Sequence, residues 1–319
     1  MAEEVVLLTN PIHGDGVAIL ERHARLIVAP DTKADTLRQL ARGVSGIIVR
    51  AQLPDDIADH APGLKGIVRH GVGLDFIPVP QATAKGIVVA NLPGSNTNAV
   101  AEYVFAAILD LRRGAAVFDR DLRDAGWDRS RSRAEKTTEI SPDTLGIIGV
   151  GAIGSRVAQI AGNGFGMRVI GTSRRTGNLP AGVQEVELDR IFEEADVVVL
   201  SCTLTDETRG LVDARRLALM KPTAVLINVS RGAVIETSSL RDALITGQIA
   251  GAALDVHDLH PLPQDDPIYS CPNLMLSPHV AAITATSSRV MSTGAAEEMC
   301  RILAGEPPLN CVNPEVLGS

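Results

Sequence analysis

Short aliphatic runs alternate along the chain with longer amphipathic stretches. In the first third, Val5–Thr9, Gly46–Arg50 and Gly66–Arg69 have the composition of buried strands. Val17–His23 and Lys33–Arg42, which lie between them, have the residue spacing of helices. Strands that alternate with helices are typical of βα units, so this part of the chain predicts a parallel sheet.

A second series of the same kind begins near Thr144. Before it, we predict a long apolar helix over Ala99–Leu111 and an exposed, Arg-rich loop over Arg123–Glu139 that Trp127 anchors. The predicted strands of the second series are Leu145–Gly149, Arg168–Thr172, Val197–Ser201, Val225–Val229, Gly251–Asp255 and Leu274–Leu276, and its clearest helices are Asp213–Met220, Ser238–Thr246 and Thr286–Leu303.

Composition narrows the class of protein. With 319 residues, 45% of them hydrophobic, the chain can bury the cores of about two domains. A net charge of -8 without long single-sign runs argues against nucleic acid or an anionic membrane as the main partner. No apolar run approaches the roughly 20 residues of a membrane span, and the acidic start MAEEVVLLTN is no signal peptide. The four cysteines stand far apart without metal-like pairing, so we expect reduced thiols, a cytoplasmic protein and no bound metal.

The most informative single motif runs from Gly149 to Gly154, as Gly-Val-Gly-Ala-Ile-Gly, between a predicted strand and a predicted helix. In a dinucleotide site the first glycine makes the tight turn, the second admits the pyrophosphate, and the third packs the helix on the strand. The helix N-terminus then offers N–H groups to the anion. A glycine-rich turn that merely packs closely is the alternative, but the strand-turn-helix context favours cofactor binding.

The residues after the next strand indicate which dinucleotide is bound. An NAD site usually places a carboxylate there for the ribose 2′-hydroxyl, but this chain reads Ser173-Arg174-Arg175. A hydroxyl and two guanidinium groups suit a 2′-phosphate. We therefore expect NADP(H), with NAD(H) as the alternative if both arginines are only solvated surface residues.

Further motifs complete a resemblance that covers nearly the whole chain. They are Val68–Asp75, Asn91–Asn96, Met220–Gly232, Gly251–Val256 and Ser277–His279. In this order, and with the glycine loop, they resemble the D-isomer-specific 2-hydroxyacid dehydrogenases, a family that includes glyoxylate/hydroxypyruvate reductases, phosphoglycerate dehydrogenases and formate dehydrogenases. The resemblance implies a homodimer formed through the cofactor domain.

The chemistry of 2-oxo acid reduction matches two residues that the resemblance marks as catalytic. Such a reaction needs a held carboxylate, a polarised carbonyl and a proton for the carbonyl oxygen. Arg231, after a predicted strand, has the permanently charged fork that binds a carboxylate. A histidine side chain ordinarily titrates near neutral pH, so His279 is the natural proton donor. Read separately, these are an ordinary surface arginine and a capping histidine; their order within the motifs favours catalysis.

The resemblance also implies residues that bind substrate and cofactor. Val72 and Gly73 lack bulk, so their N–H groups could receive the substrate carboxylate. Arg50 matches a position where some members bind a distal anion, although a surface arginine is an equal alternative. Asn96 is the remaining expected substrate contact. The expected cofactor contacts are Gly149, Gly151, Ala152, Ile153, Gly154, Ser173, Arg174, Arg175, Thr203, Thr208, Val229 and Asp255.

One position departs from the family. The resemblance places a glutamate beside the catalytic histidine, in a segment like Asp-Val-Phe-x-x-Glu-Pro, where this chain has His260. A carboxylate stabilises an imidazolium and a second imidazole does so much less. We hypothesise that His260 is part of the catalytic site and that reduction fades at a lower pH than in relatives with glutamate. A loop histidine outside the site is the equal alternative, and Asp258 could substitute as the carboxylate.

These observations predict an α/β protein of two doubly wound parallel-sheet domains: a Rossmann cofactor domain over 99–284 and a flavodoxin-like substrate domain over 1–98 and 285–319. The expected activity is NADP(H)-dependent reduction of a small 2-oxo acid, such as glyoxylate or hydroxypyruvate, to the 2-hydroxy acid. One rival is a dinucleotide-sensing binding protein like the corepressors of this fold. The other is a dehydrogenase of another small anionic acid, such as phosphoglycerate, sulfolactate or formate.

Overall fold

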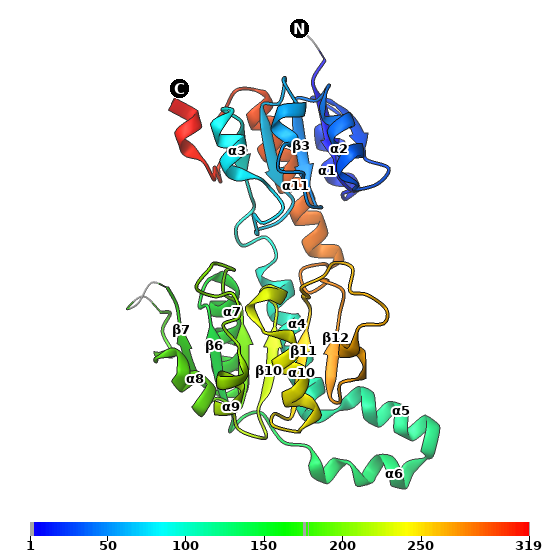
Figure 1. Ribbon diagram of the computed structural model, residues 1–319, viewed down its shortest axis with the longest axis vertical. Helices are drawn as coiled ribbons and strands as arrows, with labels where there is room; N and C mark the ends of the chain where they lie inside the picture. Colours follow the sequence, from blue (N-terminus) through cyan, green and yellow to red (C-terminus); the bar gives the residue numbers. More distant parts are fainter. Residues whose placement is uncertain (1–2, 175–176, 178, 319) are drawn as a thin grey trace. The chain divides into compact units, whose positions relative to one another are not determined.

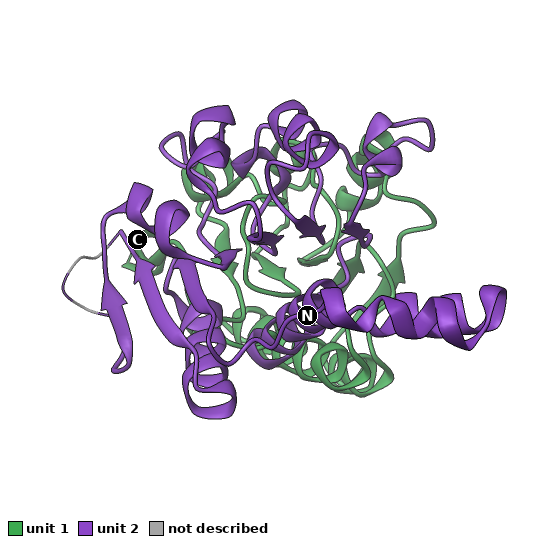
Figure 2. Cartoon of the chain, turned by 90° about the horizontal axis from the view of Figure 1, so that it is seen from below, with its two compact units in different colours: residues 1–96, 283–319 green, residues 97–282 purple. Residues whose placement is uncertain are grey.

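The computed structural model describes residues 3–174, 177 and 179–318. The chain forms two compact units, which Figure 2 shows in separate colours: unit 1 contains residues 1–96 and 283–319, and unit 2 contains residues 97–282. The chain therefore passes from one unit to the other twice, at each place two residues before the position expected from the sequence.

Unit 1 is built on a parallel sheet whose strand order is β2-β1-β3-β4-β5. This is the flavodoxin-like order, in which the strand sequence reverses between β1 and β3. Each strand is short and aliphatic, and the three central ones are almost fully buried. The strands are β1 (Val5–Leu8), β2 (Arg25–Val28), β3 (Gly46–Val49), β4 (Gly66–Arg69) and β5 (Val88–Ala90).

Helices cover both faces of this sheet, because alternate strand residues point to opposite faces and both sets are apolar. Leu8, Ile48 and Val68 pack with α1 and the long α11, whereas Leu7, Ile47 and Ile67 pack with α2 and α3 on the other face. A capping box formed by Thr284 and Ser287 starts α11. The bounds are α1 (Gly14–Leu20), α2 (Ala34–Ala41), η1 (Ile57–His60), α3 (Val79–Ala84), α11 (Ala285–Leu303) and η5 (Pro314–Gly318).

Unit 2 contains a parallel sheet of strand order β12-β11-β10-β9-β6-β7-β8. The order reverses between β6 and β9, as in the Rossmann fold. The predicted fold class of two doubly wound parallel sheets is therefore confirmed. The strands are β6 (Thr144–Ile148), β7 (Arg168–Thr172), β8 (Val183–Glu185), β9 (Val197–Leu200), β10 (Val225–Asn228), β11 (Gly251–Leu254) and β12 (Leu274–Leu276).

Two helical layers sandwich the unit 2 sheet (Figure 1). On one face α4 and α7 pack against each other, with Phe105 and Phe165 stacked at 5.2 Å between ring centroids. On the other face α8, α9 and α10 cover a second apolar cluster around the fully buried Phe192. The bounds are α4 (Thr97–Arg113), α7 (Ala152–Phe165), α8 (Leu188–Glu194), α9 (Ala214–Leu219), η3 (Gly232–Val234), α10 (Thr237–Ile245) and η4 (Pro267–Ser270).

The Arg-rich segment after α4 is not the loop that we predicted. It forms a helical hairpin of α5 (Ala115–Ala125) and α6 (Trp127–Ser132), followed by η2 (Ala134–Lys136), which projects from the rest of unit 2 (Figure 1). Ion pairs and a hydrogen bond from Ser130 Oγ to the Phe118 carbonyl hold it together. The predicted anchoring role of Trp127 is also wrong, because its surface is 68% exposed.

The three strands that we did not predict, β2, β5 and β8, lie at sheet edges. Edge strands are partly solvated, so they lack the continuous apolar pattern of buried parallel strands. Arg25–Val28 begins with a charged residue and is exposed at both ends, and Val183–Glu185 has a single aliphatic residue. Within the described residues, no helix combines the length and apolarity that crossing a membrane requires.

His70, just after β4, is an unusual buried titratable group. It is 5% exposed, and its Nε2 lies 2.8 Å from Oγ of the fully buried Ser292 in α11. Burial, with a contribution from the charges of Arg50 and Arg69, lowers the pKa of His70 to about 4. This imidazole is therefore neutral at neutral pH.

We expect His70 to make the fold acid-sensitive. A group whose pKa is lower in the folded chain stabilises the fold above its ordinary pKa of 6.5, and this contribution is lost as the pH falls towards 4. The loss corresponds to about 3 kcal/mol of unfolding free energy. Denaturant unfolding at about pH 7 and about pH 4 measures it: His70→Gln should lose less stability than the native chain over this range. The exposed-histidine control His23→Gln should behave as the native chain does, and an equal loss in all three would contradict the argument.

Candidate active site

The carboxyl ends of the unit 2 strands meet along one edge of the sheet, and the connections separate where the strand order reverses between β6 and β9. In open parallel sheets this is where ligands bind. The glycine loop 149–154 leaves β6 at this point. Ser201, which follows β9, donates its hydroxyl to the Gly149 carbonyl at 2.9 Å and so fixes the loop on the β9 side.

The three glycines of the loop have three different surroundings. Gly149 has a φ of 95°, and a Cβ there would lie 2.4 Å from Cys202. A Cβ on Gly151 would meet nothing within 4 Å, so the backbone faces open space. A Cβ on Gly154 would lie 2.6 Å from the Gly149 carbonyl oxygen. A tight turn, an open approach and a close helix contact are the three requirements of a pyrophosphate loop.

The helix that follows the loop presents its first turn to the same open space. α7 begins at Ala152, which is exposed, and its N-cap Gly151 has no side chain to satisfy the free N–H groups. Unsatisfied N–H groups and the helix dipole favour an anion at this end. The residues present therefore fit a dinucleotide, held by the loop backbone and the N-terminus of α7.

The end of β7 adjoins this loop, because the Thr172 carbonyl accepts hydrogen bonds from the N–H groups of Gly149 and Val150. Ser173 and Arg174 follow directly, the first half-buried and the second exposed. Arg175 lies outside the described residues. The carboxylate of Glu185 in β8 accepts a hydrogen bond from the Gly177 N–H at 2.8 Å, so it is already engaged.

Other expected cofactor contacts line the ends of β9 and β10. The Thr208 hydroxyl closes a turn by donating to the Thr203 carbonyl, at 2.8 Å, and accepting from the Thr205 N–H. Val229 is half-buried at the end of β10. Burial raises the pKa of the Cys202 thiol, so this cysteine is a poor nucleophile at neutral pH.

Arg231 stands on a turn that a buried amide organises. Asn228, the last residue of β10, is fully buried; its Nδ2 donates to the Arg231 carbonyl and its Oδ1 accepts from the Ser230 N–H. The Arg231 guanidinium donates in turn to the Ser230 carbonyl at 2.7 Å. The backbone that carries this arginine is therefore fixed from inside the sheet.

Asp255, at the end of β11, is a buried carboxylate that organises the neighbouring loop. It is 2% exposed and accepts hydrogen bonds from the Val280 N–H, the Ala281 N–H and the Ser277 hydroxyl, at 2.8, 2.9 and 2.6 Å. Its carbonyl accepts from the His279 N–H at 2.8 Å. All four donors belong to the loop that carries His279, so Asp255 holds this loop to β11.

His279 itself has a left-handed backbone, with a φ of 57°. Residues other than glycine adopt this conformation at a cost of about 1 kcal/mol or more. The hydrogen bonds from this loop to Asp255 supply the compensation, because a buried carboxylate left without donors would be far more costly. The unusual backbone is therefore imposed by the surrounding structure, a pattern that clusters at functional sites.

The structure brings His260 and His279 together. Their ring centroids are 5.6 Å apart with the planes tilted at 77°, an edge-to-face contact. His260 is exposed and His279 is half-buried. His257 lies on the same segment, 6.4 Å from His260 between ring centroids, and its Nε2 donates to the Ser277 carbonyl at 2.9 Å.

A close contact links the Arg231 turn to the histidine segment. A Cβ on Gly232 would lie 2.1 Å from the His257 carbonyl carbon and 2.4 Å from the Asp258 nitrogen. Only glycine permits this approach, because backbone atoms cannot yield as a flexible side chain can. Position 232 therefore fixes the spacing between the two segments that carry Arg231 and His260.

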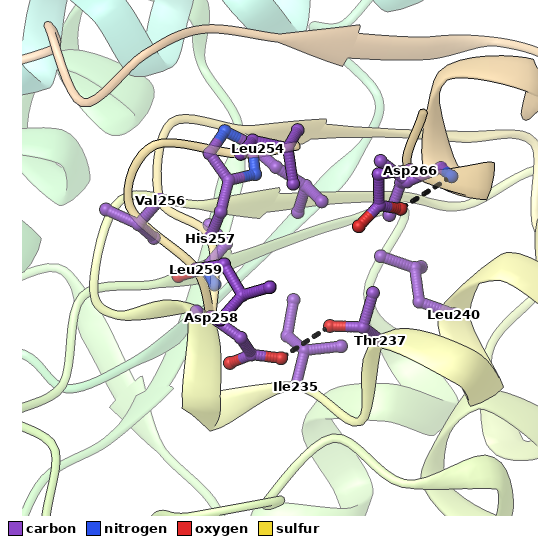
Figure 3. Close-up of a pocket in the computed structure, with 13 residues that line it drawn as sticks. Ile235, Thr237, Leu240, Leu254, Val256, His257, Asp258, Leu259 and Asp266 are labelled. Carbon is purple, nitrogen blue, oxygen red and sulfur yellow. Dashed lines mark hydrogen bonds between the residues drawn. The ribbon is translucent and has the colours of Figure 1, made fainter. Parts of the chain in front are cut away.

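A pocket of about 200 Å³ lies beside the segment that carries His257 and His260 (Figure 3). Its walls are mainly aliphatic side chains from the turn before α10, from α10 itself, from the end of β11 and from the 256–268 segment, including Ile235, Leu240 and Leu254. A hydrogen bond from the Thr237 hydroxyl to the Asp258 carboxylate, at 2.8 Å, closes one side. Asp258 is thus engaged by a residue of α10.

The four expected substrate residues belong to unit 1. Arg50 follows β3, where the strand order of that sheet reverses; its N–H donates to the Thr9 hydroxyl and its guanidinium to the Pro11 carbonyl. Burial lowers its pKa, and no described carboxylate pairs with it.

The turn after β4 presents backbone donors. Its carbonyls are engaged, since Arg69 Nε donates to the Gly73 oxygen at 3.0 Å and Asn91 donates to the Val72 oxygen at 2.7 Å. The N–H groups of Val72 and Gly73 meet no acceptor among the described residues. Asn96 has a buried Oδ1 that is likewise without a described partner.

Sequence reasoning missed the residues whose hydrogen bonds support the turns that carry Arg231 and His279. Asn228 and Ser277 are polar residues at the ends of aliphatic strands, a signal that was visible in the sequence. Tyr103, whose hydroxyl lies 2.5 Å from the Ser277 hydroxyl, is on α4, and nothing in its surroundings along the chain marks it. Among the described residues, no group of three His, Cys, Asp or Glu side chains is placed to hold a metal ion.

Comparisons with known proteins agree with this geometry. The sequence pattern described as "D-isomer specific 2-hydroxyacid dehydrogenase, NAD binding domain" matches residues 105–281. A glyoxylate reductase of Korarchaeum cryptofilum is 34% identical over 98% of this chain and 96% of its own. The chain belongs to the D-isomer specific 2-hydroxyacid dehydrogenase family. It is therefore an oxidoreductase with a nicotinamide dinucleotide cofactor, which confirms the resemblance seen in the sequence.

Two further relatives show how widely the likeness extends. A glyoxylate reductase of Aeropyrum pernix is 38% identical over 89% of this dehydrogenase and 87% of its own chain. The crystal structure of an NADPH-dependent glyoxylate/hydroxypyruvate reductase from Sinorhizobium meliloti, in complex with NADP and malonate, has a TM-score of 0.85. It is 28% identical and covers 98% of this chain and 97% of its own.

We expect Gly232→Ala to separate catalysis from folding in this dehydrogenase. The added methyl group would displace the 257–258 backbone and with it the His260–His279 contact, so kcat should fall by about a hundredfold or more. Dinucleotide affinity, measured by fluorescence, should change little because position 232 is not in the glycine loop. The matched control is Gly162→Ala in α7, where a Cβ meets nothing within 4 Å. The Gly162→Ala control should keep the native activity. If Gly232→Ala is as active as this control, the close approach of Gly232 to the 257–258 backbone is unimportant for catalysis.

Proposed function

We propose that this dehydrogenase uses NADPH to reduce a small 2-oxo acid, such as glyoxylate or hydroxypyruvate, to the 2-hydroxy acid. The observation that carries the proposal is the placement of Arg231 after β10 and of His279 after β12, with β11 between them, on the sheet edge where a loop that fits a dinucleotide also lies. The names of the relatives supply the substrate class.

In the proposed reaction, Arg231 binds the substrate carboxylate and its charge polarises the neighbouring carbonyl. When bound, the reduced nicotinamide supplies the hydride that the carbonyl carbon accepts. His279, as imidazolium, gives its proton to the carbonyl oxygen, so the product is the hydroxy acid and the histidine is left neutral. A solvent proton then restores the imidazolium.

Unit 1 by itself offers donors that suit an anion. The N–H groups of Val72 and Gly73 suit a carboxylate, because their own carbonyls are fixed and the donors are free to bind a ligand. Asn96 offers a buried amide. Arg50 has no described carboxylate partner, so we infer that it attracts the distal group of a substrate that carries a second anion.

The cofactor preference follows from the end of β7. Ser173 and Arg174 can contact a ribose 2′-phosphate, and Arg175 adds charge in the sequence. We therefore infer that NADP(H) is preferred over NAD(H).

We also infer a homodimer formed through unit 2. The helical hairpin α5–α6 carries exposed apolar side chains, with Trp127 at 68% and Leu122 at 44% exposure, which suit a partner surface. Sedimentation at several protein concentrations tests the dimer, which Trp127→Ser should weaken.

The four free cysteines suit a reducing compartment, and we infer a cytoplasmic location.

The first experiment is the initial rate of NADPH and NADH oxidation with a panel of 2-oxo acids headed by glyoxylate and hydroxypyruvate. The panel includes a phosphorylated three-carbon 2-oxo acid, and phosphoglycerate, sulfolactate and formate are tested as oxidation substrates. We expect reduction with a clear NADPH preference. Tight dinucleotide binding with no turnover on any acid would contradict the proposal and favour a dinucleotide sensor.

Ser173→Asp should reverse the cofactor preference. A carboxylate at this position repels a 2′-phosphate and accepts a hydrogen bond from a 2′-hydroxyl, so kcat/KM with NADPH should fall by about a hundredfold while that with NADH rises. Arg174→Ser should weaken NADPH alone, because it removes one charge without adding another. If both variants keep the native preference, residues 173 and 174 do not select the cofactor.

His260→Glu tests the edge-to-face histidine pair. A carboxylate in contact with His279 stabilises its imidazolium, so the pH at which reduction has fallen to half its maximum should be higher in this variant than in the native enzyme. The buried Asp255 carboxylate and the His257 imidazole face the same loop and are present in both proteins. His260→Gln, which adds no charge, is the control. Identical profiles of kcat/KM in all three proteins would place His260 outside the catalytic site.

A further inference from the structure

The loop that carries His279 is connected to a helix far away in the sequence. Tyr103 lies on α4, and its hydroxyl is 2.5 Å from the Ser277 hydroxyl, which in turn is 2.6 Å from Oδ1 of Asp255. The same carboxylate accepts the backbone N–H groups of Val280 and Ala281.

The direction of this chain of hydrogen bonds is fixed by proton counting. The Asp255 carboxylate only accepts, so Ser277 uses its single hydroxyl proton to donate to it. The Ser277 oxygen can then only accept from Tyr103, and the phenol must donate. Burial, with a contribution from the Asp255 charge, raises the pKa of Tyr103, so the phenol keeps its proton at neutral pH.

A further hydrogen bond holds the same residue of the loop through its backbone. His257 Nε2 donates to the Ser277 carbonyl at 2.9 Å, because a backbone carbonyl can only accept. Ser277 is therefore held at its hydroxyl by Tyr103 and Asp255 and at its carbonyl by His257. It stands two residues before His279, whose left-handed backbone makes its direction sensitive to any relaxation of the loop.

We propose that Tyr103, acting through Ser277 and Asp255, is a positioning residue that sets the orientation of the His279 imidazole for proton transfer. The inference rests on the proposed role of His279 as proton donor. It assigns a function to a half-buried tyrosine on α4, and it makes Asp255 a support of the histidine loop as well as a candidate cofactor contact.

The test is Tyr103→Phe, which removes one hydroxyl and leaves the ring. We expect kcat for 2-oxo acid reduction to fall by about tenfold, with the KM for the 2-oxo acid and the Kd for NADPH unchanged. The solvent deuterium isotope effect on kcat should rise, because a misdirected imidazole makes proton transfer limiting. Ser277→Ala should fall further, and Ser277→Thr, which keeps the hydroxyl, should recover most of the activity.

The chain offers a matched control, because its only other tyrosine is Tyr269, which is 52% exposed on η4 and outside this network. Tyr269→Phe should behave as the native enzyme does. Native kcat and a native isotope effect in Tyr103→Phe would overturn the proposal. So would a weaker Kd for NADPH with an unaltered isotope effect, since the network would then serve the cofactor.

A second measurement does not need turnover and so separates this inference from the proposed function. In protein labelled with ¹³C-histidine, the His279 ring resonance is identified by its absence in His279→Asn. We expect Tyr103→Phe to shift and broaden this resonance, and Tyr269→Phe to leave it unchanged. An unchanged resonance in Tyr103→Phe contradicts the positioning role even if the native protein reduces no 2-oxo acid, whereas a changed resonance with an inactive native protein contradicts only the proposed reaction.

Discussion

Every strand in both sheets runs parallel to its neighbours, and each connection must therefore cross a face of the sheet before the next strand can begin. This constraint buries both faces under helices, which is why the central strands are mainly aliphatic. It also places the carboxyl ends of all strands of a sheet along one edge. The chemistry of the protein is gathered there because the fold leaves backbone donors and side chains free at that edge.

At this edge of unit 2 the side chains are held by buried polar groups that belong to neighbouring strands. Asn228 at the end of β10 organises the Arg231 turn, and Asp255 at the end of β11 organises the His279 loop. Gly232 brings the two segments into backbone contact. Each buried polar group has its hydrogen bonds satisfied by the loop it supports, so moving a loop would leave a buried acceptor without donors. The site therefore inherits the rigidity of the sheet.

The sequence predicted the parts of the fold that periodicity and composition determine. The aliphatic strands β1, β3, β4, β6, β9, β10 and β11 were visible because burial on both faces removes polar residues from them. The edge strands β2 and β8 were not, because solvent permits charged residues in them. The α5–α6 hairpin resembled a loop because its stability depends on ion pairs and on contacts within the hairpin, which an apolar pattern does not reveal.

In the candidate site, too, local features could be predicted from the sequence and features that depend on long-range contacts could not. Glycines and charged residues next to strands were visible, since their chemistry is local. Tyr103 was not, because the contact with Ser277 joins residues 174 positions apart and depends on how α4 packs against the sheet. The His260–His279 contact, by contrast, followed from family likeness and is present in the structure.

The left-handed backbone of His279 sets the local conformational preference of this position against the catalytic role that we propose for it. Glycine or asparagine would suit the same backbone better, and either would relieve the loop while removing the imidazole. Under the proposed role, a histidine here retains the proton donor at some cost in stability. In a descendant that no longer needed the imidazole, position 279 would be among the first where a stabilising substitution could spread without other change. The residue at this position therefore offers a simple criterion for separating active enzymes of this fold from those that have lost catalysis.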